Sequence, residues 1–500
     1  MANFSVSSNF GRGFNIRSDF AIAEIANPTP WNNASLPTTY FGRARSGADT
    51  VTYEYKGQNL TNDSAFNLNS GTINAIIQYS TPNLLSFQNW ALEQTSFTVS
   101  QLRAWGSSGN VNAMLDTVLA GADLLRGNAF SDTLAGFAGN DVIFGGSGND
   151  ILFGDGGNDT LRGETGNDTI LGGHGHDTII ESSGTNSVSG DGGIDTLVHS
   201  SPRRSMSVSL IAESQTMVDG EQITSYRGRV ETNGGFTVTN FANIENLGFV
   251  DGRLVLAVND VAMQAARMYH TATGASPNIY GMNWWIDQLN AGVNLRTMAT
   301  SFATNEFVAK YGTLNSTQFI VQVYQNSAGR VPNDAELAFW GDQLSAGMPR
   351  GDVMLAFSEY VETKNRVSSI YANGLWDQDG DAASIARLYQ ATLDRRPDHN
   401  GLIGWRAEMT AGKSLMDIVP GFLNSTEFTT LYGATNNMQF VTLLYNNVLD
   451  RAPDTAGLDG WVAQLNSGAL SRAQVVLGFS ESLEFRLNTM SWIEGGVVFA

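Results

Sequence analysis

The stretch GGSGNDILFGDGGNDTLRGETGNDTILGG, from Gly145 to Gly173, repeats one pattern every nine residues. At every ninth position from residue 123 to residue 195 the chain has an aspartate, with one exception. An aliphatic residue always follows two positions later. The aspartates are Asp123, Asp132, Asp141, Asp150, Asp159, Asp168, Asp177 and Asp195. A flexible Gly-rich linker has no reason to keep an aliphatic residue in phase, whereas a coil of short strands needs one inward side chain per strand. The pattern therefore predicts a structured coil.

Each position of the pattern has a physical role. Glycines two and five positions before the aspartate permit positive φ angles and let backbone carbonyls turn toward a common point. The aspartate adds a hard anionic oxygen at the same turn, which is the kind of ligand that Ca²⁺ prefers. The eight aspartates are therefore candidate ligands for several calcium ions. The unit ESSGTNSVS departs from the pattern, with Glu181 in place of glycine and Asn186 in place of aspartate, so its ion site is in doubt.

The run resembles the RTX (repeats in toxin) nonapeptide, a calcium-binding parallel β-helix repeat with the pattern G-G-x-G-x-D-x-U-x. GGSGNDILF, from Gly145 to Phe153, matches every fixed position. The resemblance implies a parallel β-roll with two nonapeptides per turn. Asp150 and Asp168 would then lie on one edge of the roll. Asp141 and Asp159 would lie on the other edge, and the ions would form two files.

The same resemblance implies a route out of the cell. RTX proteins are typically exported unfolded through a type I secretion apparatus, directed by an uncleaved C-terminal signal, and fold where calcium is plentiful. The terminal IEGGVVFA resembles such a signal. The N-terminus lacks the basic patch and apolar core of a secretory signal peptide, and no stretch reaches the length of a membrane span. The expected location is secreted, extracellular or on the cell surface of a Gram-negative bacterium.

Composition narrows the choice of partners. The chain of 500 residues has 28 Lys and Arg against 48 Asp and Glu, a formal net charge of −20, and no cysteine. The negative charge argues against nucleic acid or an anionic membrane as partner and suits a multivalent cation. Disulfides, zinc thiolates and cysteine nucleophiles are excluded.

The expected fold class is multidomain, with the roll flanked by β-rich segments and followed by an all-α half. Residues 1–110 alternate as strands do, for example in DTVTYEYKG and GTINAIIQYS, and predict a β-rich N-terminal domain. The roll, with a short leading helix, is assigned to residues 111–198. Residues 199–260 again read as strands and are expected to cap the open end of the roll.

From Val261 onward the sequence repeats four times. Each repeat has a tyrosine, a proline eight residues later, a tryptophan after sixteen and a glycine seven beyond it. The tyrosines are Tyr269, Tyr324, Tyr389 and Tyr445, and the tryptophans are Trp285, Trp340, Trp405 and Trp461. We expect three short helices per repeat, in pairs at 261–370 and 383–488, a linker at 371–382 and a tail at 489–500. The Tyr/Trp pairs could form a sugar-stacking or peptide-binding surface, but short helices need such anchors, which favours core.

DRRPDHNG and DRAPDTAG, at 394–401 and 450–457, resemble a segment of a helical domain of unknown function that occurs in tandem in secreted bacterial surface proteins. The first repeat has Ala275 where the others have Arg330, Arg395 and Arg451, so any role of that arginine is missing there. Related helical bundles anchor some calcium-dependent surface-layer proteins to lipopolysaccharide, by analogy only.

Catalytic patterns are missing from the sequence. The five histidines form no His-Glu-x-x-His, and no G-x-S-x-G or phosphate-binding loop occurs. DQDGD, at 377–381, lacks the spacing of an EF-hand loop. The expected function is non-enzymatic: a calcium-folded extracellular protein that self-associates or attaches to the bacterial outer surface, as in a surface layer or matrix. The alternatives are a secreted glycan- or lipopolysaccharide-binding adhesin and an enzyme of unrecognised type in residues 1–110.

Overall fold

The computed structural model describes the strands within residues 1–98 and residues 119–498, with gaps at 181–182, 219–220, 233–234, 236, 278 and 494. The chain divides into two compact units, which are described separately. One comprises Met1–His199 and Ser207–Leu247, and the other comprises Ser200–Met206 and Gly248–Ala500.

The first unit begins with strands where the sequence alternates. They are β1 (Asn3–Val6), β2 (Thr29–Pro30), β3 (Thr39–Ser46), β4 (Asp49–Asn62), β5 (Leu68–Ser80) and β6 (Phe87–Thr98). They run antiparallel in the order β2-β3-β4-β5-β6-β1, and β1 also pairs in parallel with β7 of the roll. The helix expected before the roll lies outside the described residues.

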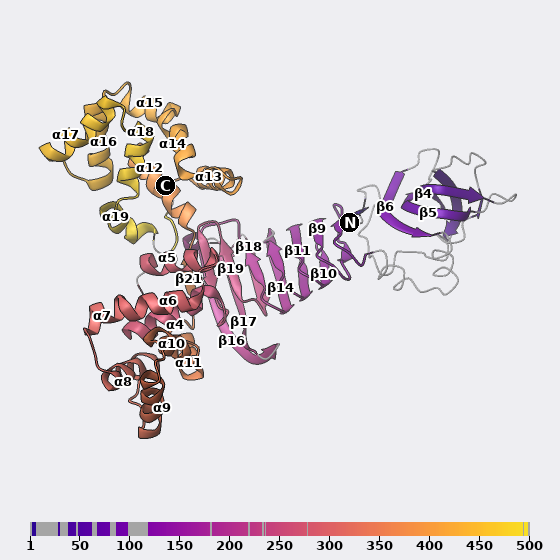
Figure 1. Cartoon of the computed structure of the whole chain (residues 1–500). Helices are drawn as coiled ribbons and strands as arrows, with labels where there is room; N and C mark the ends of the chain where they lie inside the picture. Colours follow the sequence, from indigo (N-terminus) through magenta and orange to yellow (C-terminus); the bar gives the residue numbers. More distant parts are fainter. Residues whose placement is uncertain are drawn as a thin grey trace. The chain divides into compact units, whose positions relative to one another are not determined.

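The nonapeptides form the predicted parallel β-roll. Its strands are β7 (Leu124–Arg126), β8 (Thr133–Ala135), β9 (Val142–Ser147), β10 (Ile151–Gly156), β11 (Thr160–Thr165), β12 (Thr169–His174), β13 (Thr178–Ile180), β14 (Gly184–Gly192) and β15 (Thr196–Val198). Successive strands alternate between two sheets, β7-β9-β11-β13-β15 and β8-β10-β12-β14 (Figure 1). Each strand therefore pairs with the strand 18 residues away, as Leu152 does with Ile170. The in-phase aliphatic residues fill the space between the sheets and are 0–5% exposed.

Strands beyond residue 199 continue both sheets of the roll. They are β16 (Met206–Val218), β17 (Glu221–Thr232), β18 (Thr237–Ala242) and β19 (Asn246–Phe249), after the short 3₁₀ helix η2 (Arg203–Ser205). β18 pairs in parallel with β14, the last roll strand of that sheet, and β17 pairs antiparallel with β18. The change to antiparallel pairing ends the repeat in this sheet, and the capping role of residues 199–260 stays a prediction.

The second unit carries the helical repeats, and each repeat has four helices. The first has α4 (Val261–Thr273), α5 (Ile279–Asn290), α6 (Leu295–Thr304) and α7 (Glu306–Tyr311), and the second has α8 (Ser316–Ser327), α9 (Asp334–Ser345), α10 (Arg350–Ser358) and α11 (Val361–Ile370). The third has α12 (Gly380–Leu393), α13 (His399–Thr410), α14 (Leu415–Leu423) and α15 (Thr426–Tyr432), and the fourth has α16 (Asn437–Leu449), α17 (Thr455–Ser467), α18 (Arg472–Ser480) and α19 (Leu483–Ile493).

The fourth helix corrects the expected count of three per repeat. The acidic–aromatic pair was expected to close the third helix, but it lies at the start of a new one. Ser425, for example, lies between α14 and α15, and its Oγ accepts a hydrogen bond from the backbone N–H of Phe428. This hydrogen bond caps the N-terminus of α15. Glu427 then lies in the first turn of α15, where the helix dipole favours a negative charge.

Aromatic packing confirms that the Tyr/Trp pairs form core. In the third repeat, Tyr389 meets Phe422 edge to face at 4.9 Å between ring centroids, and Trp405 stacks on Phe422 at 5.0 Å. Equivalent triads are Tyr269, Trp285 and Phe302; Tyr324, Trp340 and Phe357; and Tyr445, Trp461 and Phe479. Helix caps also lie where the sequence indicates, at Asn333, Asp398 and Asp454, while Asn278 lies outside the described residues.

The expected linker at 371–382 is a structured segment. Leu375–Gln378 forms β21, which pairs antiparallel with β20 (Gly252–Val255), and α12 begins at Gly380. Asp377 forms an ion pair with Arg253 at 2.8 Å, and Leu375 is buried. Acidic composition made this stretch read as solvated, but an arginine on the partner strand neutralises Asp377 and lets the strand form.

Candidate metal centre

The aspartates of the roll are arranged in two hydrogen-bonded files. Along each file, the backbone N–H of one aspartate donates to the Oδ1 of the residue 18 positions further on, at 2.7–3.0 Å. One file contains Asp132, Asp150, Asp168 and Asn186, and the other contains Asp123, Asp141, Asp159, Asp177 and Asp195. This is the division between two edges that the resemblance implies for Asp150 and Asp168 against Asp141 and Asp159.

Five of these carboxylates have a second oxygen that is buried and accepts no hydrogen bond. This holds for the Oδ2 atoms of Asp141, Asp150, Asp159, Asp177 and Asp195, whose side chains are 0–1% exposed. A buried carboxylate oxygen without a partner is costly, so each Oδ2 requires a cation or a proton.

Glycine keeps open the space beside each Oδ2. A Cβ built on Gly145 would lie 2.5 Å from Asp150 Oδ2 and 2.9 Å from the carbonyl oxygen of Gly163, one turn further on. Cβ atoms on Gly154 and Gly172 would meet the corresponding aspartate Oδ2 and glycine carbonyl. Each such position is lined by a carboxylate oxygen and a backbone carbonyl, which are oxygen ligands that suit Ca²⁺.

Backbone carbonyls are essential to this interpretation. Among the described residues, no three His, Asp or Glu side chains converge as a metal cluster. At each site, one carboxylate, carbonyls from adjacent turns and water would have to complete the six to eight oxygen ligands of a calcium ion. A bound ion would neutralise the Oδ2 atoms and link successive turns of the roll.

Burial perturbs the acidity of the files. It raises the pKa of Asp141 and of Asp150 to about 7, and neighbouring aspartates of the same file add to the shift, while hydrogen bonds from the backbone oppose it. The pKa of Asp195 rises to about 8 for the same reasons. A cation at these positions would compete with protons and keep the carboxylates ionised.

Asn186 keeps the geometry of its file but not the charge. Its Oδ1 accepts the backbone N–H of Asp168 at 2.9 Å, just as an aspartate would. Glu181, the other departure from the repeat, lies outside the described residues. The file that ends at Asn186 therefore has one carboxylate fewer, which supports the doubt about this ion site.

Glu245 extends the other file, and sequence reasoning missed it. The backbone N–H of Asp195 donates to Glu245 Oε2 at 2.8 Å, so this glutamate takes the place of a further aspartate. A Cβ on Gly190 would meet Asp195 Oδ2 and the carbonyl of Asn243, which replaces the glycine carbonyl of a next repeat. Burial raises the pKa of Glu245 to about 7. The signal in the sequence is an acidic residue in IENLGF, at 244–249, 50 residues beyond Asp195.

Side chains outside the files have other roles. His176 lies in a separate ladder at the exposed turn, where its Nδ1 accepts the backbone N–H of Ile194 at 2.9 Å. The backbone N–H of His176 in turn donates to the Oδ1 of Asn158, which lies one turn earlier in the roll. This contact gives His176 a structural part in the turn.

The chain contains RTX repeats. Residues 119–152 and 153–180 match the RTX calcium-binding nonapeptide repeat, and residues 298–367, 375–432 and 420–489 match the domain of unknown function DUF4214. RTX repeats bind Ca²⁺ and are characteristic of secreted bacterial proteins. No curated protein matches the chain significantly. Among the described residues, no helix is long and apolar enough to cross a membrane.

Proposed function

We propose that this protein is secreted unfolded, folds on calcium outside a Gram-negative cell, and serves a structural role by self-association or by attachment to the cell's outer surface. The observation that carries the proposal is the set of five buried Oδ2 atoms, of Asp141, Asp150, Asp159, Asp177 and Asp195, which accept no hydrogen bond and lie beside backbone carbonyls. Without a cation these carboxylates oppose folding of the roll, so low calcium inside a cell would keep the chain exportable.

The proposed ligands are Asp123, Asp132, Asp141, Asp150, Asp159, Asp168, Asp177 and Asp195, with Glu245 added at the end of one file. The proposed role is non-enzymatic, since RTX β-roll repeats are typically non-catalytic. The third candidate, an enzyme of unrecognised type in residues 1–110, concerns side chains that lie outside the described residues.

Attachment is tested by deletion in the producing cell. Removing residues 261–488 while keeping the tail should release the protein into the medium if the helical repeats anchor it. The protein should stay cell-bound if the β-rich half anchors it or self-associates. A full-length protein that stays monomeric in millimolar calcium and binds no cell surface would contradict the proposal.

An adhesin that binds glycan or lipopolysaccharide is the second candidate. One observation favours it: Trp284 is 53% exposed although the neighbouring Trp285 is buried in the helical core. An exposed tryptophan beside a pocket offers a platform on which a sugar ring can stack.

A further inference from the structure

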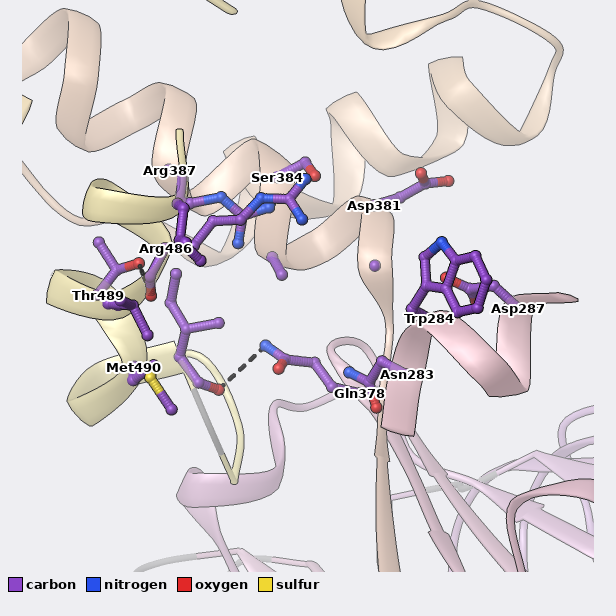
Figure 2. Close-up of a pocket in the computed structure, with 15 residues that line it drawn as sticks. Asn283, Trp284, Asp287, Gln378, Asp381, Ser384, Arg387, Arg486, Thr489 and Met490 are labelled. Carbon is purple, nitrogen blue, oxygen red and sulfur yellow. Dashed lines mark hydrogen bonds between the residues drawn. The ribbon is translucent and has the colours of Figure 1, made fainter. Parts of the chain in front are cut away.

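A pocket of about 350 Å³ lies among α5, α12 and α19 of the second unit (Figure 2). Trp284 and Asp287 face it from α5, Asp381 and Arg387 from α12, and Arg486 from α19. Its volume falls within the range of about 300–1,000 Å³ that is usual for small-ligand sites. We name it the α5–α12–α19 pocket.

The walls of this pocket are held in place. Gln378, which is 8% exposed, lines the pocket and donates from Nε2 to the carbonyl of Ile493 at 3.1 Å, which ties β21 to α19 (Figure 2). Arg387 and Arg486 both pair with Glu481 at 2.7 Å. The Trp284 ring meets the buried Trp285 edge to face at 4.7 Å between centroids. The pocket is therefore preorganised, which lowers the cost of binding.

The chemistry of the pocket has three parts. Trp284, Leu483 and Leu487 are 53–62% exposed and provide an apolar surface at the rim. Asp287 and Asp381 provide hydrogen-bond acceptors, and the buried Oδ1 of Asn283 has no partner. Burial and nearby aspartates raise the pKa of Asp287 and of Asp381.

The opposite side of the pocket provides donors. Arg387 and Arg486 are the cationic side chains there, and both pair with Glu481. A ligand that fits must therefore have one apolar face, several donors and several acceptors. A fatty chain lacks the polar groups, and an organic ammonium ion lacks acceptors for the arginines. A pyranose ring meets all three requirements, since its C–H face stacks on an aromatic ring and its hydroxyls both donate and accept.

We propose that the α5–α12–α19 pocket binds a pyranose unit of a glycan, with the sugar ring stacked on Trp284 and its hydroxyls between Asp287 and Asp381 on one side and the arginines on the other. The inference deepens the proposed surface attachment and rests on it. A second hollow of about 530 Å³ shares Asp287, Gln378, Gly380 and Asp381 with the pocket. Most of its other lining residues are polar, with Arg253 and Arg406 among them, so the site can accommodate a neighbouring sugar of the same chain.

Comparison of the repeats supplies a matched control. The residue before the core tryptophan is Trp284 in the first repeat, Phe339 in the second, and Gly404 and Gly460 in the last two. Phe339 is 55% exposed and meets Trp340 edge to face at 5.1 Å, so it has the same local setting as Trp284. Phe339 does not line the α5–α12–α19 pocket.

The test uses the full-length calcium-loaded protein. Methyl glycosides of hexoses, N-acetylhexosamines, deoxyhexoses and uronic acids are screened by saturation-transfer NMR, and the best of them is titrated. We expect at least one to bind. Trp284→Ala and the double variant Asp287→Asn, Asp381→Asn should each weaken that binding at least about tenfold, while Phe339→Ala should not change it.

Three outcomes would overturn the inference: no sugar binds, Trp284→Ala binds as the wild type does, or tetramethylammonium binds in place of sugars. Circular dichroism in calcium verifies that each variant is folded. If Trp284→Ala loses sugar binding and also detaches from cells, the pocket is the anchor. If a wild type that binds no sugar still attaches to cells, the proposed function stands and the pocket inference fails.

Discussion

At the residue scale, glycine and aspartate in the roll depend on each other. The aspartate presents its Oδ2 only because the glycine five positions earlier leaves room beside it. Gly145 has this role for Asp150, and its φ lies outside the positive range, so space alone forbids a side chain there. The nonapeptide pattern therefore requires a small residue at the glycine position as well as a negative charge at the aspartate position.

Gly145→Ala should raise the calcium concentration needed for folding by about tenfold or more, because the new Cβ would meet Asp150 Oδ2 and the Gly163 carbonyl. Circular dichroism during a calcium titration measures the midpoint. Gly121→Ala is the control, since a Cβ there meets nothing within 4 Å. Equal midpoints for the two variants would show that the space beside Gly145 is not an ion site.

Two variants of Glu245 distinguish the effect of its hydrogen bond from the effect of its negative charge. Glu245→Gln can still accept the N–H of Asp195, whereas Glu245→Ala cannot. If Glu245 helps to hold an ion, both variants should bind one calcium fewer by calorimetric titration; if it only caps the file, only Glu245→Ala should lower the stability of the roll. Glu231→Ala, which removes an exposed ion pair with Arg229, should change neither quantity.

The residue scale also shows the limit of prediction from sequence. The eight aspartates repeat at fixed spacing, so their common environment could be predicted. Glu245 lies outside any repeat, and only the parallel pairing of β18 with β14 carries the chain back to Asp195. A contact between residues this far apart in the sequence produces no repeating pattern from which it could be predicted.

At the element scale, the roll without calcium should respond to pH. Asp141 and Asp150 have a pKa of about 7 in the folded roll and an ordinary value of 3.8. The folded state therefore binds more protons than the unfolded state between these values, and its stability falls as pH rises through that window. In calcium-stripped protein, the β signal in circular dichroism should grow on acidification from about pH 8 to about pH 5.

Calcium should reverse this dependence. The ion displaces protons from the carboxylates, so binding should release protons near neutral pH and become tighter as pH rises to about 8. The number of protons released can be measured from the pH change when calcium is added to weakly buffered protein. A stripped roll that loses its β signal on acidification, or binding without proton release, would show that the aspartates are ionised without metal.

The helical repeats differ at one ion pair. Arg395 pairs with Glu427 of the fourth helix and lies over Tyr389 at 4.9 Å from the ring centroid. In the first repeat Ala275 takes the place of this arginine, and Glu306 Oε2 is buried with no hydrogen bond. Burial and the charge of Glu306 raise the pKa of Tyr269 to about 12.

Ala275→Arg should therefore stabilise the first repeat by about 0.5–1 kcal/mol, because it supplies a partner for Glu306 and a cation over Tyr269. Arg395→Ala should destabilise the third repeat by a similar amount, discounted because both groups of that pair are about a third exposed. Thermal unfolding followed at the helical signal compares the two variants with the wild type. Destabilisation by Ala275→Arg would mean that the first repeat has repacked around alanine.

Elements were easier to predict than their ends and their connections. The tyrosine, tryptophan and glycine spacing located the first three helices of each repeat, since amphipathic phase and caps are local. The strand β21 escaped prediction because DQDGD reads as solvated until Arg253 of β20 lies beside it. Its pairing depends on a strand more than a hundred residues earlier, and sequence spacing does not report such contacts.

At the scale of the whole molecule, the two units obtain their stability from different sources. The roll has a thin core of one aliphatic residue per strand and lines of buried carboxylates. The helical repeats have two large clusters of buried apolar and aromatic side chains, one centred on Phe302 and Phe357 and one on Phe422 and Phe479. Charge therefore opposes folding in one unit, while burial alone favours it in the other.

Removal of calcium at neutral pH should unfold the roll and leave the helices folded. The full-length protein in excess chelator should lose its β signal in circular dichroism and keep its helical signal, and Ca²⁺ at about 10⁻⁴–10⁻³ M should restore the β signal. Mg²⁺ should not, because it requires a smaller octahedral site and gives up its water reluctantly.

Trp405→Ala provides the reciprocal test. The loss of its stacking on Phe422 should destabilise the helical transition by about 3 kcal/mol and leave the calcium midpoint of the roll unchanged. A β signal that persists in chelator would mean that the roll is stable with its carboxylates uncompensated. Loss of both signals together would mean that the helices depend on the ion-bound roll, and the two units would then fold as one.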